Sequence, residues 1–342
     1  MTRFPSYLPV VAALLLALGL AAKGLVLAQA QPQLMSAYRA GPLPLTDPLS
    51  PEWDTAPVLT VPLIPQAGIV PALPAVTVPS VNVQSLNDGQ SIVFRLTWDD
   101  ATPDRHATLT NTFRDAAALQ FAVSPTLPVI CMGAAGQPVN LWHWKADWQS
   151  DIDEGFHDVV DAYPNFWLDH YPFVVGEPPY RLPSDFNSPE ARAYLVGWTA
   201  GNRFSEPARV TPVEDLSALG FGTVESQANQ DVLGRGVWEN GRWHAVFSRP
   251  LRSADPNDVQ FAPGQTIPVA FAVWDGADQQ VGGRKQLSTW TTMLIEAAQP
   301  ETPAPATLFG LPYPAAIAVL VALALVILGG IVFVLRRRKA AA

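Results

Sequence analysis

The chain has 342 residues, and its middle, between the end segments 1–30 and 311–342, holds all 30 acidic residues but only 15 of the 21 basic ones. A body with a formal charge of −15 argues against nucleic acid as a partner, because the phosphate backbone requires a basic face. The single cysteine, Cys131, excludes an internal disulfide, a cysteine-rich zinc site and the C-x-x-C-H motif of covalently attached haem.

The first 30 residues have the features of an export signal. Arg3 precedes an apolar run over residues 8–22, and Ala28-Gln29-Ala30 offers a small-x-small cleavage site. This pattern predicts a signal peptide over 1–30. Lys23 interrupts the late part of the run, so an uncleaved signal anchor is the alternative. Both interpretations place the rest of the chain outside the cytoplasm.

The body, residues 31–298, has the pattern of a mainly β domain. Residues 91–98 alternate, with Ile92, Phe94, Leu96 and Trp98 on one face. Runs of similar length and aromatic or β-branched content follow at 116–123, 139–145, 267–274 and 288–295. Asn240-Gly241 lies between two such runs and favours a two-residue type I′ hairpin. We therefore expect an immunoglobulin-like or carbohydrate-module-like sandwich of two antiparallel sheets with long loops.

The C-terminus predicts a stalk and a membrane anchor. Residues 299–314 are rich in Pro and Ala and indicate an extended stalk. The 21 residues 315–335 contain no charge or strongly polar group, and as a helix they would span roughly 31 Å, the thickness of a bilayer core. The tail 336–342 begins with three Arg and a Lys, which are retained on the cytoplasmic side. The expected location is the cell membrane, with a single-pass anchor and the domain on the extracytoplasmic face.

Motifs of common enzyme classes are absent from the sequence, which contains no nucleophile elbow, P-loop or dinucleotide fingerprint. None of its five histidines forms an H-x-x-x-H pair. His157 lies among acidic residues, namely Asp153, Asp158, Asp161 and Asp169. This neighbourhood is typical of a solvated loop face, with calcium or another hard metal as the alternative.

Several stretches together resemble one family. They are Asp115–Ala122, Cys131-Met132-Gly133, Gln137–Ala146, Trp238–Trp243, Phe247–Leu251, Phe271–Gly276 and Gly283–Trp290. In order and spacing they resemble the haem-b-binding gamma subunits of the ethylbenzene dehydrogenase type, whose relatives serve dimethylsulfide dehydrogenase and the chlorate and nitrate reductases. The resemblance covers about residues 50–296.

What the resemblance implies is a β-sandwich that holds one haem b between a methionine and a lysine, here Met132 and Lys285. Once Met35 is assigned to the region near the leader, the body contains two candidate methionines, Met132 and Met293, and two candidate lysines, Lys145 and Lys285. The residue inventory is therefore compatible with this pair. Met293 falls in a strand pattern and is expected to fill the core. His143 and His244 remain rival axial ligands, since imidazole is a common haem ligand.

The resemblance also implies a role and partners. With two side chains on the iron, the haem would transfer electrons and not catalyse a reaction. The expected partners are an iron–sulfur subunit and a molybdopterin catalytic subunit, and the membrane anchor favours exchange with the quinone pool or a cytochrome. The alternative is a carbohydrate-binding module on the cell surface, because such sandwiches share the pattern at Trp53-Asp54 and at Asn240–Trp243.

Overall fold

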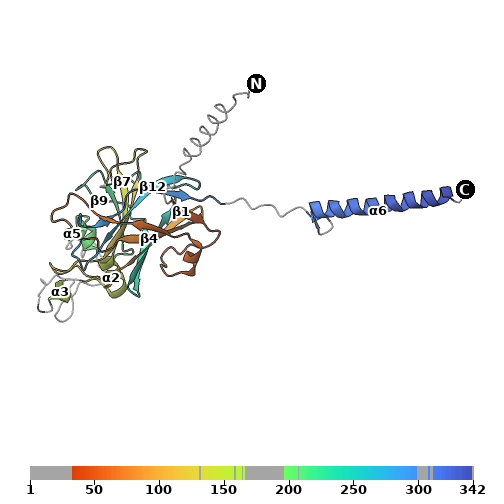
Figure 1. The fold of residues 1–342 in the computed structure, drawn as a ribbon. Coiled ribbons are helices and arrows are strands. Elements are labelled where there is room, and N and C mark those ends of the chain that lie inside the picture. The colour runs from red at the N-terminus through yellow and green to blue at the C-terminus, as the bar shows by residue number, and fades with distance from the viewer. Residues whose placement is uncertain are drawn as a thin grey trace, which may run out of the picture. The chain divides into compact units, whose positions relative to one another are not determined.

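The structure is a computed structural model that describes residues 33–130, 132–157, 159–163, 165, 196–206, 208–298, 307–308 and 311–340. The predicted leader, residues 1–30, lies outside the described residues. The chain divides into two compact units, residues 1–298 and 299–342. The described part of the first unit is built mainly of strands, with short helices at its periphery (Figure 1), so the predicted mainly β class is confirmed.

Most elements of the first unit are strands of two to nine residues. The strands are β1 (Gln33–Tyr38), β2 (Leu59–Pro62), β3 (Ile64–Pro65), β4 (Ser80–Asn87), β5 (Ser91–Asp99), β6 (Ala116–Ala122), β7 (Val139–Lys145), β8 (Val213–Ala218), β9 (Glu225–Ser226), β10 (Leu233–Glu239), β11 (Arg242–Pro250), β12 (Thr266–Trp274), β13 (Gln286–Leu287) and β14 (Thr291–Ile295). The helices are α2 (Ala146–Glu154), α3 (Val159–Ala162) and α5 (Val196–Thr199), with 3-10 turns η1 (Pro51–Thr55) and η2 (Arg203–Ser205).

Hydrogen bonds join these strands into one sheet with the order β10-β11-β5-β4-β1-β14-β12-β6-β7-β8-β9. Strand β1 connects the two halves of this sheet. Its residues 33–36 pair in parallel with β14, and its residues 36–38 pair in parallel with β4. The expectation of two antiparallel sheets is therefore wrong, because the strands form one continuous sheet that includes parallel pairs. The switch occurs at Ser36, which is fully buried; its Oγ accepts a hydrogen bond from Ser85 Oγ at 2.9 Å and its carbonyl accepts one from Asn87 Nδ2 at 2.8 Å.

The two halves of the sheet pack face to face through aromatic side chains. Phe94 of β5 lies 5.8 Å from Trp142 of β7, and Trp98 lies 6.1 Å from Trp144, between ring centroids. Trp144 also contacts Trp243 of β11 at 4.9 Å. Aromatic pairs at these distances add to the area that they bury. The apolar face predicted for residues 91–98 is confirmed, because all four of its side chains lie in this core.

The predicted hairpin is confirmed in its register. Glu239 of β10 pairs with Arg242 of β11, and the two residues between them, Asn240 and Gly241, have φ angles of 52° and 77°. Two positive φ angles in a two-residue loop are the signature of a type I′ turn, which Asn-Gly adopts readily.

The second unit contains β15 (Thr307–Leu308), β16 (Leu311–Pro312) and α6 (Tyr313–Ala340), a 28-residue helix that covers the predicted span (Figure 1). Among the residues that the structure describes, no helix has both the length and the apolarity that crossing a membrane requires.

Candidate functional site

A pocket of about 510 Å³ lies on the outer face of strands β12, β6, β7 and β8, opposite the aromatic core. Side chains alternate between the two faces of a strand, so the residues next to each core residue point outward. On β7, Trp142 and Trp144 fill the core, whereas Leu141, His143 and Lys145 line the pocket. A volume of this size is in the range of sites for small-molecule ligands and cofactors.

The floor of the pocket is made of small side chains in register across neighbouring strands. Ala118 of β6 pairs with Ala272 of β12 on one side and with His143 of β7 on the other. One step along, Ala270 pairs with Gln120. Methyl groups cover little of the space above a sheet, so this row leaves room for a flat ligand to lie against the strands.

Met132 and Lys285 meet in this pocket. The Nζ of Lys285 lies 3.8 Å from the Sδ of Met132, although 153 residues separate them in the chain. Lys285 is only 6 % exposed, directly precedes β13, and has its Nζ 5.1 Å from the ring centroid of Trp274. The two residues that the sequence analysis singled out thus lie together, while their roles as iron ligands remain a prediction.

The backbone around Met132 is tightly constrained. Met132 has a φ of 63° and Gly133 a φ of 84°, the Met132 N–H donates to the Ile130 carbonyl at 3.0 Å, and the turn of residues 134–137 follows directly. A Cβ at Gly133 would lie 2.8 Å from the Gln137 carbonyl oxygen and 2.9 Å from that of Ala218, so this position accommodates only glycine. A left-handed conformation at a non-glycine residue has a free-energy cost, and such residues cluster at functional sites. The turn fixes the direction in which the thioether points.

Lys145 lines the same pocket but is committed to an ion pair. Its ammonium contacts the carboxylate of Glu214 on β8 and lies 3.6 Å from the ring centroid of Trp148. Both charged side chains are almost fully buried. Burial lowers the pKa of Lys145 to about 8, and the attraction of Glu214 opposes that shift. Lys145 therefore has a structural partner in place, which makes it a poor metal ligand.

The two rival histidines lie in different places. His143 lines the pocket, and its ring stacks on Trp274 with centroids 4.7 Å apart. Its Nε2 is buried and has no hydrogen-bond partner among the described residues. Burial, followed by the repulsion of Lys145, lowers the pKa of His143 well below its usual value, so the ring is neutral and its nitrogen is available. His244 lies on β11, in the other half of the sheet, 3.2 Å from Thr97 Oγ1, and does not line the pocket.

Other predictions about single residues are settled by burial. Met293 is fully buried in the aromatic core, as predicted. Trp53 and Trp243, on which the carbohydrate-binding alternative depended, are 0 % and 1 % exposed. A sugar-stacking platform requires an accessible ring, so neither of these tryptophans can serve as one.

Two charged residues of the pocket, Glu214 and Arg114, were not predicted from the sequence. Glu214 lies in β8, a strand that was not predicted, because the segment Val213–Ala218 contains two acidic residues and a serine and shows no alternation of apolar residues. Arg114, just before β6, lines the pocket and pairs with Asp147 Oδ2 at 2.7 Å. A guanidinium at this position can also hold a carboxylate of a ligand.

Comparison with known proteins places this architecture in a family. The sequence profile of the family described as ethylbenzene dehydrogenase matches residues 50–286. The respiratory nitrate reductase heme subunit ORF7 of Haloferax mediterranei is 27 % identical over 266 residues, which cover 78 % of this chain and 69 % of that protein. The dimethylsulfide dehydrogenase subunit gamma of Rhodovulum sulfidophilum is 29 % identical over 213 residues, 60 % of this chain and 56 % of that protein.

Further comparisons agree with this assignment or add little to it. The chlorate reductase subunit gamma of Ideonella dechloratans is 24 % identical over 240 residues, 69 % of this chain and 73 % of that protein. A family 9 carbohydrate-binding module of Caldicellulosiruptor kristjanssonii, solved with glucose, aligns with a TM-score of 0.39 and 6 % identity over 80 % of this chain and all of that one. That likeness is too low to carry an argument. Because the family profile matches most of its length, the chain belongs to the ethylbenzene dehydrogenase family.

Proposed function

We propose that this protein is the haem-b-binding gamma subunit of a molybdoenzyme complex, anchored in the cell membrane, and that it transfers electrons between that complex and the respiratory chain. The observation that carries the proposal is the meeting of Met132 Sδ and Lys285 Nζ at 3.8 Å in a pocket of about 510 Å³. The names of the related proteins, a nitrate reductase heme subunit and two gamma subunits, support it.

The pocket suits a haem in its shape and in its donor atoms. A thioether is a weak hydrogen-bond acceptor, so its contact with a buried lysine contributes little as a hydrogen bond. As metal ligands the two groups are better matched, because sulfur is a soft donor and an unprotonated amine is a nitrogen donor. Ala118, Ala270 and Ala272 form a flat apolar floor, and Arg114 offers a cation for an anionic group of the ligand. Met132 and Lys285 would hold the iron.

The donor set determines the role. When bound, the haem supplies one-electron transfer, and two side-chain ligands leave the iron no open position for a substrate. The residues of the chain then have to orient the cofactor and exclude water. Leu141 and Leu216 cover the apolar surface beside Met132 on the outer face of the sheet, and a dry surrounding is one of the features by which a protein tunes a redox potential.

The partners and location follow from the relatives and from the sequence. Gamma subunits named for a dimethylsulfide dehydrogenase and a chlorate reductase support assembly with a catalytic subunit. The molybdopterin of that subunit and a further iron–sulfur subunit are proposed from the family resemblance of the sequence. The export pattern of residues 1–30 and the apolar stretch 315–335 support a body on the extracytoplasmic face with a membrane anchor. A body held at the membrane can exchange electrons with the quinone pool or a membrane cytochrome.

The test is spectroscopic and uses the full chain purified in detergent. A pyridine haemochrome assay should give one non-covalent haem b and a low-spin spectrum. Met132→Ala and Lys285→Ala should each convert the spectrum to a high-spin or water-ligated form, and Lys285→Arg should not restore it, because guanidinium stays protonated. Met132→His should keep the haem and lower its reduction potential, since a more basic ligand favours ferric iron.

The matched control is His244→Ala, which removes a histidine outside the pocket and should leave the spectrum unchanged. Lys145→Ala is unsuitable as a control, because it leaves Glu214 buried without its partner. If Lys285→Ala keeps the wild-type spectrum while His143→Ala loses it, the iron has Met132 and His143 as its ligands. If the protein binds no haem, or both Met132→Ala and Lys285→Ala bind it as the wild type does, the proposal is wrong.

A further inference from the structure

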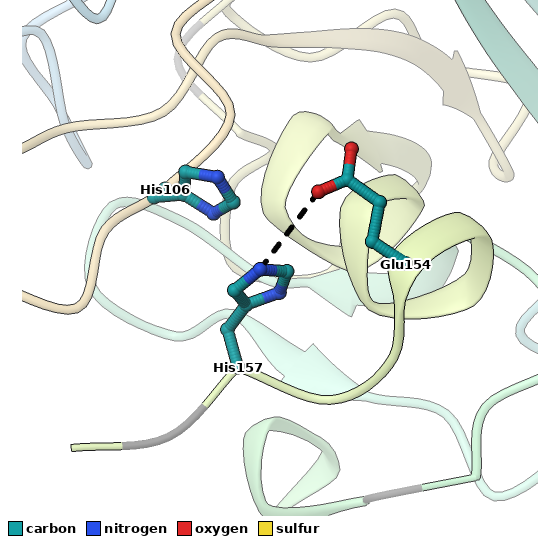
Figure 2. Close-up of side chains that lie close together, drawn as sticks. All are labelled: His106, Glu154 and His157. Carbon is teal, nitrogen blue, oxygen red and sulfur yellow. Dashed lines mark ion pairs between the residues drawn. The ribbon is translucent and has the colours of Figure 1, made fainter. Parts of the chain in front are cut away.

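Outside the haem pocket, two histidines and a glutamate converge at the end of α2. His106 belongs to the loop between β5 and β6, Glu154 is the last residue of α2, and His157 follows it by three residues. One ligand atom from each side chain lies within 4.8 Å of the other two. Figure 2 shows the His106 ring facing the His157 ring, with the Glu154 carboxylate beside them.

The spacing of these atoms is close to that of a metal site. The Nε2 of His157 lies 3.9 Å from Oε2 of Glu154, and the rings of His106 and His157 have centroids 4.3 Å apart. Two donors bound at about 2.0–2.2 Å to one tetrahedral Zn²⁺ lie roughly 3.3–3.5 Å from each other. The His157–Glu154 distance is a few tenths of an ångström longer than this, and the wider limit of 4.8 Å for the whole set requires movements of up to about 1.5 Å, which rotations of these exposed or partly exposed side chains can supply.

The surroundings orient the donors. The Nδ1 of His157 lies 3.5 Å from Oδ1 of Asp151, which also accepts a hydrogen bond from the His157 backbone N–H at 3.0 Å. Asp151 is itself held by Arg209, whose Nε lies 3.3 Å from Oδ2. Asp151 therefore fixes the backbone at His157 and lies near Nδ1 without a hydrogen bond to it, and a metal bound through Nε2 would favour a proton on Nδ1 facing this carboxylate. Similarly, Arg105 lies 3.6 Å from Oε1 of Glu154, which leaves Oε2 toward His157.

We propose that His106, Glu154 and His157 bind a divalent transition-metal ion, with Zn²⁺ as the best match. Two imidazoles and one carboxylate form a donor set that suits zinc and its neighbours, whereas calcium requires oxygen ligands. A hollow of about 240 Å³, lined by His106, His157 and Asp151, leaves space for a water to complete the coordination. The set differs from the hard-metal alternative of the sequence analysis, which joined His157 to Asp153, Asp158, Asp161 and Asp169, because His106 is brought in from a distant loop. Asp158 and Asp169 lie outside the described residues.

The position of the site gives it a structural consequence. It connects the loop of residues 100–115 to the end of α2, and the same loop and helix are joined by the ion pair of Arg114 with Asp147. Arg114 lines the haem pocket, and Lys145 directly precedes α2. A metal ion at this point therefore stabilises the wall of the pocket, and a ligand that binds only the folded state raises the stability of that state.

The test is a zinc titration of the full chain in detergent after treatment with a chelator. Competition with a chromophoric chelator should show one tight equivalent of Zn²⁺, and Co²⁺ at the same site should give the visible absorption of a four- or five-coordinate ion. His106→Ala, His157→Ala and Glu154→Gln should each weaken Zn²⁺ binding at least tenfold. Asp151→Asn should weaken it about 10–100-fold, as expected for the group that orients a metal-binding histidine.

Two controls make the outcome decisive. His244→Ala removes a histidine far from the site and should bind Zn²⁺ like the wild type. The melting temperature of each variant without metal shows whether it folds. At a Zn²⁺ concentration that just saturates the wild type, the wild type and His244→Ala should gain more stability than the site variants. The proposal is overturned if no tight equivalent binds to the wild type, or if His106→Ala and His157→Ala, folded as the wild type is, bind Zn²⁺ with unchanged affinity.

Discussion

The two faces of strands β12, β6 and β7 show how one sheet serves two purposes. Their inner face presents bulky side chains, among them Phe271, Phe121 and Trp142, which interlock with the other half of the sheet. Their outer face presents Ala118, His143 and other small or titratable side chains, and there the pocket lies. The inner face gains stability from burial, whereas the outer face gives up packing to leave room for a ligand.

On the outer face, the two lysines of the pocket have different roles. Lys145 is paired with Glu214 and holds β7 to β8, while Lys285 faces the thioether of Met132. Both lysines are buried on the same side of the sheet, so burial alone does not identify the ligand. The ion pair of Lys145 with Glu214, and the position of Lys285 beside the Met132 thioether, make the distinction.

The largest effect is expected from breaking the buried pair. Lys145→Ala should lower the free energy of unfolding by about 3–5 kcal/mol, because it leaves the Glu214 carboxylate buried without its cation. Denaturant unfolding of the full chain measures this. The double variant Lys145→Met, Glu214→Leu should recover most of the loss, since neither charge then remains. A loss below about 1 kcal/mol in Lys145→Ala would show that water reaches Glu214 and that the pair is not structural.

The inner face includes a buried carboxyl group at Asp215, which predicts that stability depends on pH. Asp215 of β8 is 1 % exposed and accepts a hydrogen bond from Asn140 at 2.6 Å, whereas its Oδ2 has no partner among the described residues. Burial, followed by repulsion from Asp258, raises the pKa of Asp215 to about 8. The folded state thus binds the proton more tightly than the unfolded state. Its contribution to stability is complete below about pH 4 and is lost as the pH rises to about 8.

The Asp215→Asn variant tests this sign. It keeps the accepting Oδ1 and replaces the unpartnered Oδ2 by an amide, so it should lose less stability between pH 5 and pH 9 than the wild type, by up to a few kcal/mol. The variant should still decline in this range, because burial also raises the pKa of Asp115 to about 8. The exposed Asp278→Asn serves as the control. Parallel stability curves for Asp215→Asn and the wild type would contradict the assignment.

Much of the fold could be predicted from the sequence because its signals are local. Alternation over residues 91–98 and the Asn240-Gly241 turn each depend on a few neighbouring residues, and both are confirmed. The switch of β1 between two partners could not be predicted, since its parallel pairing with β4 and β14 depends on contacts across most of the chain. The apolar and β-branched segments of the sequence predict where strands lie, but not which strands pair with each other.

The same distinction between local signals and long-range contacts applies to the candidate site. The resemblance to a family indicated Met132 and Lys285, and the structure brings them together. Residue types alone could not rank Lys145 below Lys285, because the partner Glu214 lies 69 residues away in an unpredicted strand. For the same reason His106 was not connected with His157, from which 51 residues separate it. Convergence in space is the information that a single sequence lacks.

The smallest effect on stability is expected from a change on the outer face, and two adjacent residues of β6 allow a matched comparison. Ala117 is fully buried in the aromatic core, and Ala118 forms the floor of the pocket. Ala117→Phe should destabilise the protein by about 1–3 kcal/mol, because the packed interior has no space for a ring. Ala118→Phe should change the free energy of unfolding of the haem-free protein by less than about 1 kcal/mol, since the ring can enter the pocket.

Ala118→Phe should have a large effect on haem binding, although its effect on stability is small. The ring occupies the space above the alanine floor, so we expect haem affinity to fall at least tenfold while the haem-free protein keeps its melting temperature. Haem titration and thermal unfolding of the same preparation measure both quantities. Equal destabilisation by Ala117→Phe and Ala118→Phe would show that the outer face is packed as tightly as the core. Wild-type haem affinity in Ala118→Phe would place the cofactor away from β6, and the proposed pocket would then be wrong even if Met132 and Lys285 influence the spectrum.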